Sequence, residues 1–245
     1  MSKTLTQFNN ALKHLVFISR LLSKKQNAQI PPSQAPAREH NLKHQRSTPR
    51  VQLRRPRDKE STMQFVPLTE ANPAIQAHVR TLRNQEDVRK YMYTSHEISD
   101  QEHANWLTSL KGNSRQQVFV VLKEERAVGV VSLNAINTVQ KTADWAFYLD
   151  VQLQGKGLGS VVEFWMLDYA FAEAGLEKLN CEVLASNPAV VKMHQKFGFE
   201  LEGVRRQNIL KDGERIDVVL LGITKDEWLS KRPALQKVVE RIGAI

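Results

Sequence analysis

Residues 153–160 read LQGKGLGS and place three glycines within five positions. Glycine lets a backbone come close to an anion and turn successive N–H groups toward it. A helix that follows such a loop adds unpaired N-terminal donors and the positive end of its dipole. The loop therefore suits a phosphate or a diphosphate, and a flexible hinge without chemistry is the alternative.

The spacing in this loop departs from two common phosphate motifs. A GxGxxG motif would need glycine at Ser160, and a Walker loop would need GxxxxGK[ST]. Gln154, Gly157 and Gly159 instead fit Q-x-x-G-x-G, and Lys156 could add a point charge.

A second segment follows at residues 186–203 and reads SNPAVVKMHQKFGFELEG. With the glycine loop it resembles the GNAT superfamily of N-acetyltransferases, in which [R/Q]-x-x-G-x-[G/A] binds the pyrophosphate of acetyl-coenzyme A. The superfamily's downstream segment is N-x-x-[A/S]-x-x-[L/M]-Y-x-K-x-G-F. Its matches in this chain are Asn187, Met193, Lys196, Gly198 and Phe199. Two motifs in order, separated by one helix and one strand, are more specific than either alone.

This resemblance implies a GNAT fold of the α/β (α+β) class, with acetyl-coenzyme A as co-substrate and no metal. The residues that it places at the coenzyme are Leu149, Val151, Gln154, Gly155, Lys156, Gly157, Leu158, Gly159, Ser160, Asn187 and Lys196.

One position departs from the superfamily pattern. The tyrosine that protonates the coenzyme A thiolate is replaced here by His194. An unperturbed imidazole titrates near about 6.5 and a thiol near about 8.5, so an imidazolium can donate a proton to a departing thiolate. We expect His194 to be the general acid. The alternative is that it only packs against the coenzyme while solvent supplies the proton.

Residues 83–110, RNQEDVRKYMYTSHEISDQEHANWLTSL, resemble a narrower subgroup. That subgroup acetylates the 4-amino group of a UDP-linked 4-amino-4,6-dideoxy altrosamine in pseudaminic acid biosynthesis. The resemblance covers about Phe65 to Thr224. It implies a small-molecule UDP-aminosugar acceptor, bound by Arg83, Met92, Tyr93, His103, Trp106 and Tyr148.

These residue types suit a nucleotide sugar. Tyr93 and Trp106 offer flat faces to a uracil ring, and Arg83 can hold a diphosphate in a bidentate manner. His103 is a hydrogen-bonding neighbour, and Met92 is an adaptable apolar contact. Alternatively, Trp106 is a core residue of its helix, and Arg83 caps a helix or pairs with nearby Glu86 or Asp87.

The expected reaction is direct attack by the neutral amine in a ternary complex. The coenzyme should lie where the strand around 148–151 splays from the strand around 181–185. Backbone N–H groups from Leu149 to Val151 would polarise the thioester carbonyl. Glu182 is the candidate base, acting through a water, although it could also lie on the solvated face of its strand.

Other functions remain open on the sequence alone. One is acetylation of a ribosomal-protein or peptide N-terminus, or of a polyamine, on the same fold. Another is a non-catalytic coenzyme A-binding module whose tail docks on nucleic acid or on an anionic membrane.

The elements that position these residues begin at Met63. The pattern predicts a mixed sheet of six or seven strands with helices on both faces. Predicted strands are 63–68, 116–136 as a hairpin, 141–151, 178–185 and 199–224 as two strands joined at Asp212-Gly213. Predicted helices are 72–84, 86–93, 100–112 with a capping box from Ser99 to Glu102, 159–175, 187–198 and 225–245.

Charge separates residues 1–62 from the rest of the chain. This segment holds 13 Lys and Arg against 3 acids, whereas the whole chain of 245 residues has a net charge of only +9. Residues 27–62 are rich in Gln, Pro, Ser and Arg, so we expect a disordered basic extension. Residues 6–25 could form a mitochondrial presequence or a membrane-surface helix, or translation could start at Met63.

We therefore expect an extension at 1–62, an acetyltransferase domain at 63–228 and a helical extension at 229–245. The core, with a net charge of −1, should not bind nucleic acid. The apolar run in the first segment is too short and broken for a membrane span. Cys181 is the single cysteine and should be a core residue, and the histidines from Met63 onward lack metal-ligand spacing. We expect a cytoplasmic protein.

Overall fold

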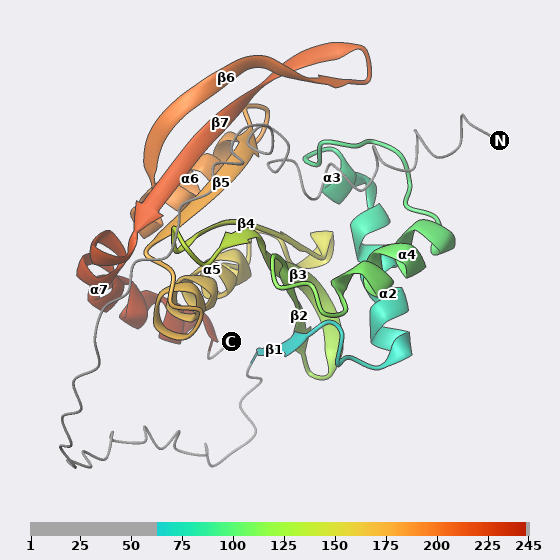
Figure 1. Ribbon diagram of the computed structural model, residues 1–245, viewed down its shortest axis with the longest axis horizontal. Coiled ribbons are helices and arrows are strands. Elements are labelled where there is room, and N and C mark those ends of the chain that lie inside the picture. The colour runs from blue at the N-terminus through green and yellow to red at the C-terminus, as the bar shows by residue number, and fades with distance from the viewer. Residues whose placement is uncertain (1–62, 244–245) are drawn as a thin grey trace, which may run out of the picture. The chain divides into compact units, whose positions relative to one another are not determined.

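The computed structural model describes residues 63–243 of the chain. These residues form one seven-stranded mixed sheet in the order β1-β2-β3-β4-β5-β7-β6 (Figure 1). The prediction of a mixed sheet with helices on both faces is confirmed. The basic extension predicted at 1–62 lies outside the described residues.

The strands are β1 (Gln64–Pro67), β2 (Gln117–Lys123), β3 (Arg126–Asn137), β4 (Thr142–Leu149), β5 (Lys178–Leu184), β6 (Glu200–Lys211) and β7 (Glu214–Thr224). The helices are α2 (Pro73–Asn84), α3 (Glu86–Arg89), α4 (Asp100–Leu110), α5 (Leu158–Asp168), α6 (Pro188–Phe197) and α7 (Lys225–Gly243). A 3-10 turn, η1 (Val151–Leu153), precedes the glycine loop, and a π-helical turn, η2 (Tyr169–Glu173), extends α5.

The period-two pattern of β2 divides the interior into two cores. Phe119 and Val121 pack in the core that α5 covers, while Val118 and Val120 pack in the core that α2 and α4 cover. Successive side chains of a strand point to opposite faces, so one apolar run serves both layers. Figure 1 shows α2 and α4 together beside β1–β3, and α5 beside α7.

The two central strands separate where the sequence predicted a wedge. β4 is paired with β3 from Thr142 to Leu149. Its parallel pairing with β5 covers only three positions, the last of them Asp144 opposite Asn180. Beyond that point the described strands diverge. The second half of β4 therefore presents one backbone edge to open space, between the elements that carry the two predicted motifs.

Local signals placed most element ends correctly. Ser99 and Glu102 form the predicted capping box at the start of α4, with Ser99 N donating to Glu102 Oε2 at 2.8 Å. Asp212 and Gly213 both have positive φ, 51° and 87°, as a two-residue hairpin turn requires.

Three predicted bounds differ from the structure. Helix α3 ends at Arg89 instead of continuing to residue 93, and the Lys211 ammonium donates to carbonyls of the turn that follows. The helix predicted at 159–175 changes to π-helical geometry at Tyr169. The domain boundary proposed at 228/229 falls inside α7, which runs on from Lys225.

Candidate active site

A cavity of about 940 Å³ opens at the wedge between β4 and β5. It extends from the glycine loop to the segment around α3 and α4. The predicted residues that line it are Arg83, Met92, Tyr93, His103, Trp106, Tyr148, Leu149, Gln154, Gly155, Gly157, Gly159, Ser160, Glu182, Asn187 and His194. Residues up to 111 positions apart in the chain therefore share one wall, as expected of a donor site beside an acceptor site.

The glycine loop has the conformation of an anion cradle. Gly155 and Gly157 have φ of +75° and +80°, and Gly157 is the left-handed N-cap of α5. A Cβ at Gly159 would lie 3.2 Å from Met193 Sδ, so the Met193 side chain would have to shift by a few tenths of an ångström to admit one. The amides of Leu158 and Gly159 at the start of α5 have no backbone partner among the described residues, whereas Ser160 N donates to Gly157 O at 2.9 Å. The residues present thus fit the pyrophosphate of coenzyme A.

Four residues predicted at the coenzyme do not line the cavity. The Val151 amide donates to Gln85 Oε1 at 3.1 Å, which removes it as a free oxyanion donor. Lys156 is exposed on the loop, and Lys196 is exposed on α6. Leu158 is 6% exposed and belongs to the core, because α5 turns that face inward.

The amide of Leu149 points into the wedge. Leu149 lies opposite Gly129, and the next amide, Asp150 N, donates to Val128 O at 2.8 Å. In an antiparallel ladder this places Leu149 at a non-hydrogen-bonded position, whose N–H and C=O turn away from the partner strand. Leu149 is therefore the better placed of the two predicted amide donors.

His194 forms a buried pair with Glu163. His194 Nδ1 and Glu163 Oε1 are 2.8 Å apart, and the two residues are 3% and 0% exposed. Burial raises the pKa of Glu163, and the neighbouring His194 lowers it. The sequence analysis missed Glu163, although one signal was visible. Its carboxylate is the only charge in the apolar run VVEFWML.

Two carboxylates lie at the point where β4 and β5 separate. Glu182 accepts from Tyr93 Oη at 2.5 Å through one oxygen and pairs with Arg205 through the other. Among residues 63–243, Asp144 accepts only from Asn180 Nδ2, at 3.3 Å, and burial raises its pKa to about 6. Asp144 is the less engaged of the two, and the sequence analysis missed it.

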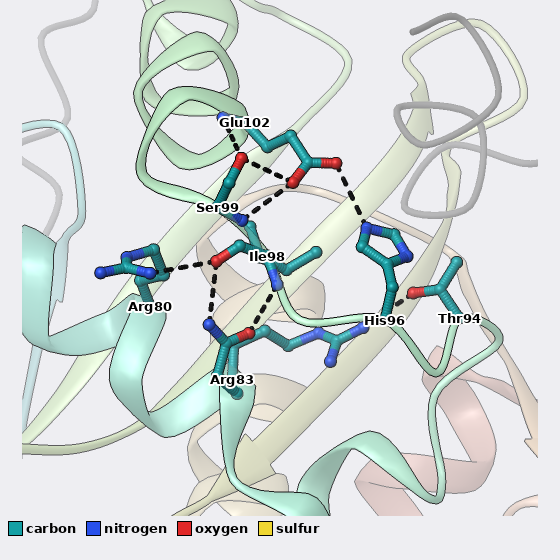
Figure 2. Close-up of polar contacts among 8 residues, drawn as sticks. Arg80, Arg83, Thr94, His96, Ile98, Ser99 and Glu102 are labelled. Carbon is teal, nitrogen blue, oxygen red and sulfur yellow. Dashed lines mark hydrogen bonds and ion pairs between the residues drawn. The ribbon is translucent and has the colours of Figure 1, made fainter. Parts of the chain in front are cut away.

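A polar network joins α2 to the segment before α4 (Figure 2). Arg80 donates to Ile98 O at 3.1 Å. Its guanidinium also pairs with Asp100 at 2.7 Å, so it is engaged at both ends. Arg83, one helical turn later, donates to Thr94 Oγ1 at 3.1 Å. Its other amino nitrogen, Nη1, is buried without a hydrogen-bond partner among the described residues.

Arg83 does not take the ion pairs that the sequence allowed. Asp87 pairs with Lys90 instead. Burial lowers the pKa of Arg83, and Arg89 nearby lowers it further, while Tyr148 raises it. A guanidinium stays charged in proteins, so this cavity wall carries a cation that no described carboxylate neutralises.

The aromatic and imidazole residues are split between cavity and core. Trp106 packs on the second core, yet it also lines the cavity, and its buried Nε1 has no hydrogen-bond partner in the described part of the chain. His103 is 8% exposed and hydrogen-bonds Gln76 O at 2.7 Å, and burial lowers its pKa. His103 therefore supports the wall as much as it faces the cavity.

A family model described as an acetyltransferase (GNAT) domain matches residues 63–200, more than half of the chain. The chain belongs to the GNAT acetyltransferases. This confirms the resemblance drawn from the glycine loop and the segment at 186–203. The protein is an acetyl-coenzyme A-dependent N-acetyltransferase.

The chain is similar to a spermidine acetyltransferase and to the acetyltransferase PseH. The spermidine N(1)-acetyltransferase of Vibrio cholerae is 23% identical over 154 residues, covering 62% of this chain and 89% of that protein. The acetyltransferase PseH of Campylobacter jejuni is 28% identical over 119 residues, covering 49% of this chain and 73% of that protein.

The solved structure of the V. cholerae spermidine N-acetyltransferase with CoA and spermine shares the fold. Its TM-score is 0.64 at 22% identity, covering 69% of this chain and 99% of that one. No helix among residues 63–243 of this acetyltransferase is long and apolar enough to cross a membrane.

Proposed function

We propose that this acetyltransferase moves an acetyl group to the 4-amino group of a UDP-linked 4-amino-4,6-dideoxy sugar, as in pseudaminic acid biosynthesis. The observation that most supports this proposal is that Nη1 of Arg83, on the cavity wall, is buried and unpaired among the described residues. The resemblance of residues 83–110 to that subgroup supports the same acceptor. On the sequence argument alone, we propose that the reaction takes place in the cytoplasm.

The charge of Arg83 favours an anionic acceptor. A buried guanidinium without a counter-charge is unfavourable unless a ligand supplies one. A diphosphate would provide oxygens for the fork of donors that guanidinium presents. A polycation in the same place would be repelled.

The remaining acceptor contacts fit the nucleoside. Tyr93, Trp106 and Met92 line the cavity near Arg83. Aromatic faces of this kind stack on a base, and a methionine adapts to its edge. Tyr93 is held by Glu182, so its ring orientation is fixed before any ligand arrives.

Four residues are assigned roles in the direct transfer. When bound, acetyl-coenzyme A supplies an activated thioester. The Leu149 amide donates to the thioester oxygen, and positioning in the ternary complex supplies much of the rate. Asp144 or Glu182 takes a proton from the acceptor amine, and Asp144 is the better candidate because fewer donors occupy it. His194 supplies a proton from its cavity side.

A polyamine is the second candidate acceptor. The cavity is also lined by carboxylates, which a polyamine would need, and relatives of this chain include spermidine acetyltransferases. Most of these carboxylates are already engaged. Asp87 pairs with Lys90, Glu102 with Ser99 and His96, and Glu182 with Arg205.

The acceptor is decided by parallel assays. Purified protein with acetyl-coenzyme A is given the UDP-aminosugar, spermidine and an N-terminal peptide, and kcat/KM is measured for each. We expect the highest value for the UDP-aminosugar. A higher value for spermidine or for the peptide would overturn the proposal.

An Arg83→Met variant tests whether the Arg83 guanidinium binds the acceptor. Because charge-assisted hydrogen bonds contribute about 1.5–3 kcal/mol, the KM for the UDP-aminosugar should rise about 10- to 100-fold. The KM for acetyl-coenzyme A should stay unchanged. Arg215→Met is the matched control, since Arg215 is an exposed arginine of β7 outside the cavity lining. An equal KM in the Arg83 variant would remove the support for an anionic acceptor.

A further inference from the structure

The Glu163–His194 pair joins the two helices that carry the superfamily motifs. Glu163 lies in the second turn of α5, which begins at the glycine loop, and His194 lies in the last turn of α6. Trp145, Phe147 and Phe199 surround the imidazole, with ring centroids 5.0, 6.3 and 5.3 Å away. The carboxyl group of Glu163 is therefore buried against an imidazole that aromatic rings surround.

Burying this ionisable pair is energetically unfavourable if its only role is packing. Glu163 Oε2 is buried with no hydrogen-bond partner among the described residues. An apolar side chain of similar size would fill the same space without an unsatisfied oxygen. Strongly perturbed ionisable groups beside a cavity are typical of functional sites.

The geometry leaves one ring nitrogen for the cavity. Nδ1 is taken by Glu163, whereas Nε2 has no hydrogen-bond partner in residues 63–243, and His194 lines the cavity. We propose that Glu163 is a positioning residue for proton transfer. It shares one proton with His194 Nδ1, so that Nε2 carries a second proton facing the cavity. This proposal rests on the proposed acid role of His194.

Nε2 carries a proton whether the shared proton lies on Glu163 or on Nδ1 of His194. A carboxylate with an imidazolium, or a carboxylic acid with a neutral imidazole, both leave a proton on Nε2 when the pair is electrically neutral. During transfer the Nε2–H bond breaks, its electron pair stays on Nε2, and an S–H bond forms on the departing thiolate. Nδ1–H then faces the Glu163 carboxylate. Solvent restores the Nε2 proton after product release.

Few other titratable groups face the pair. Trp145 and Phe147 on β4, and Phe199 before β6, bring no charge. On β5, burial raises the pKa of Cys181, and the charge of Glu163 raises it further, so the thiol stays protonated. Asp144 and Glu182 also raise the pKa of Cys181, and the lysines of α6, Lys192 and Lys196, are exposed.

Glu163→Gln tests the proposal, since the amide keeps the size and removes the charge. We expect kcat to fall about 10- to 100-fold, within the range of general acid catalysis, with an unchanged KM for acetyl-coenzyme A. The descending limb of the kcat–pH profile should move to lower pH, because an amide stabilises imidazolium less than a carboxylate does. Val162→Ala, at a fully buried neighbour in α5, should lower Tm without moving this limb.

A double variant separates positioning from structure. In a His194→Gln background, Glu163→Gln should change kcat by less than about twofold, because its effect passes through His194. If the double variant lost kcat by the product of the two single losses, the proposal would be overturned. It would also be overturned if Glu163→Gln lowered Tm and left the pH profile unmoved.

A second measurement needs no acceptor and so remains decisive if the proposed function fails. Nitrogen-15 NMR of the histidine ring, assigned by loss of the signal in His194→Gln, reports which ring nitrogen carries a proton. In a pH series, the His194 ring should lose its proton at a lower pH in Glu163→Gln than in the wild type, because the amide does not balance the charge of imidazolium. The same midpoint in both proteins would show that Glu163 does not hold the proton.

Discussion

The charged side chains of this cavity fall into two groups. Some have hydrogen-bond or ion-pair partners for their polar atoms, and others keep polar atoms that are not fully paired. Glu182 and Arg80 have partners at both ends, whereas Asp144 and Arg83 do not. Groups left incompletely satisfied inside a protein are disproportionately functional, because burial without a partner is unfavourable. We therefore propose that Asp144 and Arg83, and not Glu182 and Arg80, act on the acceptor.

Asp144→Asn tests the base. Burial raises the pKa of Asp144 from 3.8 to about 6, so wild-type kcat should rise as pH increases through about 6. The variant should lose this ascending limb and about 100-fold or more in kcat, the usual range for a positioned base. If Glu182→Gln abolished the limb and Asp144→Asn kept it, the base would be Glu182.

The same substitution has a predicted effect on stability. A carboxyl whose pKa is raised by folding stabilises the native state below its unfolded pKa, and this contribution is lost as pH rises through the folded value. For Asp144 that window runs from 3.8 to about 6. Above it, Asp144→Asn should be at least as stable as the wild type. Melts at pH 4.5 and 8 measure this difference.

The elements around the cavity are tied together by contacts distant in sequence. Lys211, at the end of β6, donates its ammonium to the carbonyls of Arg89, Lys90 and Met92 at 2.8, 2.7 and 2.8 Å. It is 8% exposed, and burial lowers its pKa. The β6–β7 hairpin thus fixes the end of α3 and the segment that carries Tyr93.

Lys211→Met should loosen this segment. Three buried carbonyls would lose a charged donor, which should destabilise the fold by about 2–3 kcal/mol. The KM for the acceptor should rise while the KM for acetyl-coenzyme A stays constant, because only the acceptor wall moves. Thermal melts and the two KM values test this. Lys178→Met, which removes a surface pair with Glu202, is the control.

The glycine loop can be tested with two glycines in the same backbone region. Gly155 and Gly175 have φ of +75° and +67°, and a Cβ at either would meet nothing within 4 Å. Alanine at each should therefore cost about 1 kcal/mol of strain. Only Gly155→Ala should raise the KM for acetyl-coenzyme A, since Gly175 lies outside the cavity lining. Equal KM values in both variants would argue against a pyrophosphate at this loop.

Along the described chain, α7 connects distant parts of the donor site. Arg232 forms a two-point ion pair with Asp168 near the end of α5, at 2.7 and 2.8 Å. Ile242 packs at Gly157, where an added Cβ would lie 3.1 Å from its side chain. The helix that the sequence assigned to an extension therefore braces α5 from one end to the other.

Ending the chain after residue 228 should consequently affect the coenzyme site. Loss of Leu235, Val239 and their packing should cost about 3 kcal/mol and lower Tm by roughly 10 °C. The KM for acetyl-coenzyme A should rise. An active enzyme that ends at residue 228 and has native Tm would show that α7 is dispensable.

Deleting residues 1–62 should leave kcat and both KM values unchanged, since their charge sets them apart in the sequence.

Sequence patterns alone predicted the superfamily and the mixed sheet, and they proposed the loop at 154–160 as the coenzyme site. These features depend on patterns local to the chain, namely glycine spacing, period-two alternation in β2 and the capping box at Ser99. Local patterns can be read without a structure because the backbone period and turn chemistry decide them within a few residues.

Packing in three dimensions set which of these groups keep an unused donor or acceptor. Glu163 meets His194 across 31 positions, and Gln85 captures the Val151 amide across 66. Arg205 reaches Glu182 from another strand and leaves Asp144 as the freer carboxylate. Such partners are chosen by how helices and strands pack, and packing brings together residues whose spacing in the chain carries no periodic signal. Protonation and pairing in this site are therefore properties of the fold.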